Sequence, residues 1–140
     1  MKDNILRISI VKAFVYYISI KRYAVFLERW SLNGKELYCI GHVIFLNSTW
    51  GITRNIPSIK IYKRSEFSLK DIAENNYNDQ ILALKNLPYT DDITEYKDIK
   101  NDCREYNIFD VEKNFYKDPY GGLDLLESCD EFKRSMKHGI

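Results

Sequence analysis

The dipeptide Asn33-Gly34 constrains the fold more than any other short stretch, because it separates two long runs of β-prone residues. A type I′ turn needs positive φ at both central residues, and Asn-Gly adopts this conformation at little cost. The dipeptide therefore predicts a hairpin that places Trp30 opposite Leu37, which is ordinary cross-strand packing. We expect residues 28–39 to turn the chain rather than to form a site.

Residues 5–64 are rich in Ile, Val, Tyr and Phe, which favour strands. Every second residue from Leu6 to Ile20, except Lys12, is apolar or aromatic, so we expect one apolar face. Such a run is long for a single strand, which predicts a bulge or bend near Lys12. A helix is the alternative there, because no Gly, Pro or Asn interrupts the run. A further strand is expected over residues 56–62.

From residue 66 onward, apolar residues recur at helical spacing. Ser68 and Asp71 resemble a capping box, and residues 80–87 continue or restart the helix that they open. Thr90 is a good N-cap and predicts a helix that extends to about Tyr106. A short helix is expected over 109–116. The last amphipathic helix carries Leu125, Leu126, Cys129, Phe132 and Met136 on one face.

The order of these elements predicts an α+β fold, in which an N-terminal antiparallel β-sheet (about residues 5–64) is packed by C-terminal α-helices. The length of 140 residues and the absence of a Pro/Gly/Ser-rich linker predict a single globular domain, 1–140. The uncharged run over residues 13–20, which lies between Lys12 and Lys21, is too short to span a membrane. Three widely separated cysteines and no secretory signal indicate a reducing, cytoplasmic environment.

The near-neutral net charge hides a division between the two halves of the chain. Residues 1–70 hold twelve Lys/Arg against four Asp/Glu, whereas residues 71–140 hold nine against sixteen. Such a division indicates either a charged partner or docking of one half on the other.

Candidate catalytic and metal sites are weak. Cys39 and His42 have the spacing of half a metal site, but an odd separation places them on opposite faces of a strand. Gly121-Gly122 precedes a helix without the Lys-Ser/Thr of a phosphate-binding loop, so it is interpreted as a turn. We expect no metal and no cofactor.

Basic residues in the N-terminal half leave a nucleic-acid function open. Lys60, Tyr62 and Arg64 alternate on one face of an expected strand, a pattern that can hold single-stranded nucleic acid. His42, Arg54 and a tyrosine could serve a metal-independent ribonuclease. A solvated sheet edge is the simpler interpretation of the basic strip.

The most distinctive pattern lies in the helix expected after Thr90. Five acidic residues recur there at spacings of 4, 3, 4 and 3, which predicts an acidic ridge along one helical face. Such a ridge would attract a basic partner, although it could also be a solvated face. The expected partner-binding residues are Asp91, Glu95, Asp98, Asp102 and Glu105, with Tyr96 and Tyr106 beside them.

These observations favour a non-catalytic protein-binding module. The sharpest version is an inhibitor or immunity (antitoxin-like) protein that neutralises a basic toxin, such as a nuclease, through the acidic helical surface. Eleven tyrosines suit a contact surface, and the Asn-, Ile-, Lys- and Tyr-rich usage is typical of AT-rich bacterial loci. The alternatives are a small nucleic-acid-binding protein or metal-independent ribonuclease that uses the basic N-terminal sheet, and a structural subunit of a homodimer.

Overall fold

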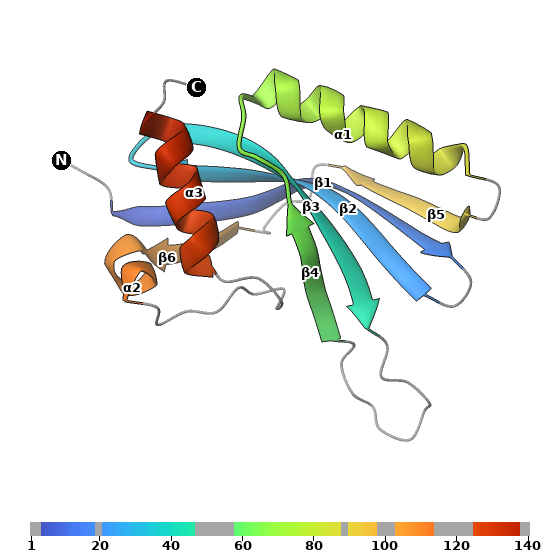
Figure 1. The fold of residues 1–140 in the computed structure, drawn as a ribbon, viewed down its shortest axis with the longest axis horizontal. Coiled ribbons are helices and arrows are strands. Elements are labelled where there is room, and N and C mark those ends of the chain that lie inside the picture. Colours follow the sequence, from blue (N-terminus) through green and yellow to red (C-terminus); the bar gives the residue numbers. More distant parts are fainter. Residues whose placement is uncertain are drawn as a thin grey trace.

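The computed structural model describes residues 4–18, 21–46, 58–87, 90–97, 103–113 and 125–137. Three long antiparallel strands form the centre of one sheet: β1 (Ile5–Ile18), β2 (Lys21–Leu32) and β3 (Lys35–Leu46). The outer strands are β4 (Ser58–Arg64) beside β3, and β5 (Thr90–Lys97) and β6 (Cys103–Asn107) beside β1. The helices are α1 (Lys70–Lys85), α2 (Ile108–Glu112) and α3 (Leu125–Lys137). The expected α+β class, with an N-terminal sheet and C-terminal helices, is confirmed (Figure 1).

The hairpin between β2 and β3 forms as predicted. Asn33 and Gly34 have φ values of 54° and 79°, and Trp30 lies opposite Leu37. The register between β2 and β3 runs without a shift from this turn to the far ends of the strands. The turn therefore fixes which residues face which side along the whole hairpin.

A β-bulge in β1 lies where it was expected, between Ile10 and Lys12. Its consequence was not foreseen: the extra residue exchanges the two faces of the strand. The even-numbered residues Leu6 and Ile8 belong to one buried cluster, whereas Phe14 belongs to the other. The prediction of one continuous apolar face was therefore wrong, and so was a helix over Ile5–Ile18.

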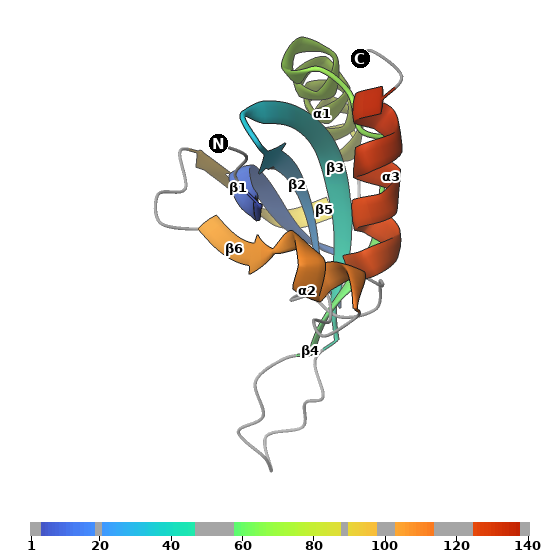
Figure 2. The same cartoon turned by 90° about the vertical axis from the view of Figure 1, so that its left-hand side faces the viewer.

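Both faces of the sheet carry a core. The first core lies against α2 and α3, and the second lies against α1. Because Cys39 of β3 belongs to the first core and its neighbour Ile40 to the second, the two cores lie on opposite faces. Helices α1 and α3 also cover different halves of the long strands (Figures 1 and 2).

The buried faces of the helices agree with the apolar pattern of the sequence, whereas the start of α1 differs from the prediction. Helix α1 is continuous and buries Ala73, Tyr77 and Ile81, but its N-cap is Leu69 without a side-chain cap, so the capping box was wrong. Helix α3 buries Leu125, Cys129 and Phe132, as its amphipathic pattern predicted. None of the helices in the described residues is long and apolar enough to cross a membrane.

The helix expected over residues 90–106 was wrong, because β5 and β6 occupy most of this stretch. Lys97 pairs with Lys12 and Cys103 pairs with Ser9, so the two strands follow β1 as one edge strand interrupted near the bulge. The stretch contains Ile93, Thr94 and Tyr96, which also suit a strand. Pairing with β1 satisfies its backbone and overrides the helical spacing.

The close approach of Phe26 to Gly41 gives a test of the register. A Cβ atom at position 41 would lie 2.5 Å from Cε2 of the Phe26 ring. We expect Gly41→Ala to lower the free energy of unfolding by about 1–3 kcal/mol, measured by urea denaturation, because the buried ring must move. In a Phe26→Leu background the same change should cost less, and equal costs in both backgrounds would contradict this contact.

Candidate functional site

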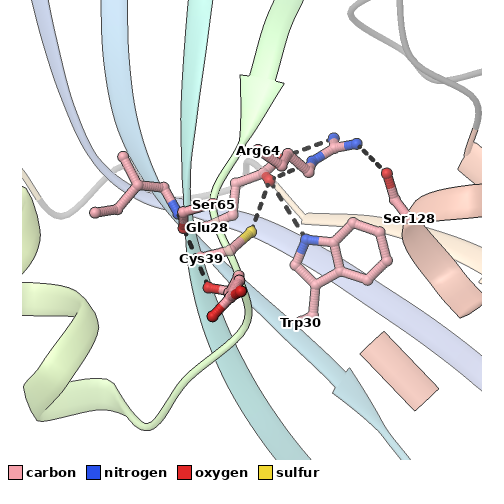
Figure 3. A network of polar contacts seen from close by, with 8 residues as sticks. Glu28, Trp30, Cys39, Arg64, Ser65 and Ser128 are labelled. Carbon is pink, nitrogen blue, oxygen red and sulfur yellow. Dashed lines mark hydrogen bonds and ion pairs between the residues drawn. The ribbon is translucent and has the colours of Figure 1, made fainter. Parts of the chain in front are cut away.

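A buried ion pair joins Glu28 of β2 to Arg64 at the end of β4. The Glu28 side chain is 0% exposed and that of Arg64 is 5% exposed. Arg64 Nε lies 2.7 Å from Glu28 Oε1, and Nη2 lies 3.3 Å from Oε2, so the contact is bidentate (Figure 3). Bidentate geometry offsets much of the cost of removing both charges from water.

Further partners surround this pair and tie several elements together. Glu28 Oε1 also accepts hydrogen bonds from Trp30 Nε1 at 3.4 Å and from Cys39 Sγ at 3.3 Å. Arg64 Nη1 donates to Ser128 Oγ of α3 at 3.0 Å, and its guanidinium lies 5.2 Å from the Trp30 ring centroid. The network therefore connects β2, β3, β4 and α3 beside the first core (Figure 3).

The segment after β4 holds Arg64 in place because it stays bonded to β3. Ser65 N donates to Ile40 O at 2.8 Å, and Ile40 N donates to Ser65 Oγ at 2.7 Å. Ser68 and Tyr38 then exchange two backbone hydrogen bonds of 2.8 Å. These bonds fix the chain on its way to α1, so the Glu28–Arg64 network has the geometry of a structural clamp.

The buried thiols are poorly suited to nucleophilic chemistry. Cys39 donates to a carboxylate, and a thiolate at that position would be repelled by the same oxygen. Burial raises the pKa of the Cys129 thiol from 9.0 to about 11, with Lys133 lowering it and Asp130 raising it less strongly. The Cys129 thiol is therefore protonated near neutral pH.

The fold separates the residues of the candidate metal site, and it also separates those of the candidate basic strip. Cys39 and His42 lie on opposite faces of β3, as their spacing predicted, and among the residues described no three His, Cys, Asp or Glu gather to hold a metal. Arg64 belongs to the buried network. The interpretation of Lys60, Tyr62 and Arg64 as a solvated strip was therefore wrong for Arg64. Arg54 and the Gly121-Gly122 turn lie outside the described residues.

The predicted acidic ridge does not exist as a helical face. Asp91 and Glu95 lie on β5, opposite Tyr17 and Phe14, and Glu105 lies on β6 opposite Arg7. Asp98 and Asp102 lie outside the described residues. The acidic residues that are placed follow the outer edge of the sheet instead.

The two tyrosines expected beside the ridge also lie on this edge. Tyr96 pairs with Ala13, whereas Tyr106 pairs with Leu6 and packs against the first core. The strand register, rather than helical periodicity, therefore decides which of these residues are neighbours. The β-branched and aromatic residues of this stretch were the sequence signal for a strand, and helical spacing obscured it.

Ion pairs near this edge and on the helices are more exposed than the clamp. Arg7 Nε lies 3.9 Å from Glu105 Oε2, with side chains 40% and 59% exposed. Such pairs contribute little stability in water. Lys133 of α3 donates to Glu112 of α2 at 2.9 Å, and this bond raises the pKa of Lys133 while burial opposes the rise.

Removing one partner of the clamp tests its structural role. We expect Glu28→Gln to lower the free energy of unfolding by about 3–5 kcal/mol, because it leaves the Arg64 cation buried without a carboxylate. Glu105→Gln, in the exposed pair with Arg7, is the matched control and should cost at most about 1 kcal/mol. Similar small losses in both variants, measured by denaturant titration, would show that the clamp contributes little.

The raised pKa of Cys129 predicts a loss of stability in alkali. Between pH 9 and about 11 the unfolded chain releases a thiol proton that the folded chain retains, so raising the pH favours unfolding in that window. We expect this group to remove about 2 kcal/mol of unfolding free energy over the window. The pH profile of Cys129→Ala should be flatter than that of the wild type, and parallel profiles would contradict the assignment.

Comparisons with protein-family models, curated proteins and solved structures give no match to this chain. Its function must therefore be inferred from the charges, contacts and topology of its own residues.

Proposed function

We propose that this protein is a non-catalytic binding module that holds a basic protein partner against the acidic edge of its sheet. The acidic edge consists of β5 and β6, whose four acidic residues, Asp91, Asp92, Glu95 and Glu105, outnumber the two basic ones, Lys97 and Arg104. The observation that supports this proposal is the position of these strands at the opposite side of the sheet from β4.

The separation of the two edges argues against internal neutralisation of the charge. Four strand spacings lie between β4 and β5, which corresponds to roughly 19 Å across the sheet, about twice the Debye length in 0.1 M salt. Lys60 and Lys63 of β4 are therefore too far away to pair with the acidic edge, and Arg64 is already paired with Glu28. Arg7 and Lys12 of β1 lie beside β6 and β5, so they compensate part of the acidic charge locally.

The chemistry of the described core also favours binding over catalysis. Glu28 and Arg64 neutralise each other away from solvent, and the Cys129 thiol is protonated near neutral pH. A nucleic-acid function of the N-terminal sheet is less favoured, because Arg64 is no longer available to its basic strip.

The finer form of the proposal is an inhibitor, of the immunity or antitoxin type, that neutralises a basic toxin in the bacterial cytoplasm. A nuclease is a suitable target, because its substrate site must attract phosphates and is therefore basic. An acidic surface on the inhibitor would accelerate association and would occupy the same site. The module would need no cofactor for this role.

Charge reversal at the acidic edge tests this proposal. The tagged protein is used to capture partners from its native lysate at low salt after nuclease treatment, and bound proteins are identified by mass spectrometry. We expect a stoichiometric basic protein, and we expect Asp91→Lys with Glu95→Lys to weaken its binding at least tenfold, since like charges then oppose.

The matched control reverses Lys60 and Lys63 to glutamate on the opposite edge, and it should retain the partner. Circular dichroism and thermal unfolding establish that each variant is folded. Equal capture by the wild type and the acidic-edge variant would contradict the proposal, and so would recovery of nucleic acid alone from an untreated lysate.

A further inference from the structure

We propose that the partner contributes a basic, extended segment that pairs with the backbone of β5 and β6 and adds a strand to the sheet. This inference rests on the proposed function, because it assumes a basic protein partner. It differs from docking of side chains on a charged surface, since the main recognition groups are backbone N–H and C=O groups. The direction of these groups follows from the hairpin and the strand registers.

The two-residue turn sets the direction of hydrogen bonding across the whole sheet. Leu32 and Lys35 close the Asn33-Gly34 turn, so their backbone groups point toward each other. This direction alternates along a strand, and therefore Arg29 of β2 points its backbone groups toward β1. The backbone groups of its partner Ser9 then point toward β2, so those of Ile8 point toward β6.

On β6, this alternation separates bonded from outward-facing residues. Arg104 and Tyr106 lie opposite Ile8 and Leu6, so their backbone groups are directed at β1. The backbone groups of Cys103 and Glu105 therefore point away from the sheet. The hydrogen bond of 2.9 Å from Ile108 N to Asn4 O agrees with this alternation.

On β5, the alternation differs because the bulge in β1 shifts it by one residue. Beyond it, Lys12 and Phe14 pair with Leu27 and Val25 and point their backbone groups toward β2. Ala13 and Val15 then point toward Tyr96 and Thr94 of β5. The intervening residue Glu95, together with Lys97, directs its backbone groups outward.

These outward-facing groups lie on an edge that no other strand covers within the described residues. An uncovered strand edge is a template for another strand, and a partner segment can satisfy its N–H and C=O groups. Acidic residues at positions 91, 95 and 105 select a segment that carries Lys or Arg. Pairing of this edge with a second copy of the chain is the competing outcome, and sedimentation experiments distinguish it from binding of a basic segment.

The decisive variants separate the backbone of Glu95 from its charge. Glu95→Gln removes the charge and keeps the N–H, whereas Glu95→Pro also removes the outward N–H. Proline is tolerated on an edge strand when its nitrogen faces solvent, so the Pro variant should fold. We expect it to weaken capture of the basic partner at least tenfold more than the Gln variant does.

A peptide probe tests the same mode without altering the protein. The probe is a blocked ten-residue peptide of alternating Lys and Val, and its control is N-methylated at every residue so that neither edge can donate backbone hydrogen bonds. We expect the unmethylated peptide to slow hydrogen exchange of the Glu95, Lys97 and Glu105 amides at least tenfold by NMR. The inward-facing amides of Thr94 and Tyr96 should be protected with or without it.

The outcomes distinguish this inference from the proposed function. If Glu95→Pro captures the basic protein as well as Glu95→Gln does, or if both peptides bind equally, strand addition is overturned while a charge-dependent binding module survives. Concentration-dependent self-association through this edge in sedimentation experiments would also overturn it. Failure to capture any basic protein, together with no effect of charge reversal, would reject the proposed function itself.

Discussion

The ion pair between Glu28 and Arg64 is the interaction on which the arrangement of the first core depends. Two charges without access to water are stable only when each satisfies the other, and this requires β2 and β4 to keep one relative position. Ser128 adds α3 to the same constraint. Apolar packing would tolerate small shifts of the helix, whereas a bidentate pair has one favourable geometry.

Local signals in the sequence were sufficient for much of the fold. The Asn33-Gly34 turn predicted a register that continues along both strands, the length of the first strand predicted its bulge, and the apolar spacing predicted α3. The clamp could not be predicted in this way, because Glu28 and Arg64 are 36 residues apart and each resembles an ordinary strand charge. Only their meeting in three dimensions identifies Arg64 as a core residue.

The acidic segment shows the opposite limit of sequence reasoning. Residues 90–106 satisfy a helical pattern, yet an open edge of β1 offers their backbone a partner that an isolated helix lacks. The composition predicted an acidic surface, and the topology decides its form: an edge with directed backbone groups instead of a ridge of side chains. The predicted contact role of these residues remains a proposal, now with a different geometry.

The long strands of the sheet also determine how the molecule unfolds. One strand supplies Leu6 and Ile8 to the core on one face, and Phe14 to the core on the other. Neither core can lose β1 while the other stays intact, although α1 and α3 cover different halves of the sheet. Strands β2 and β3 also supply both cores, through Trp30 and Leu27 and through Cys39 and Ile40, so the two hydrophobic centres share three strands and should unfold as one cooperative unit.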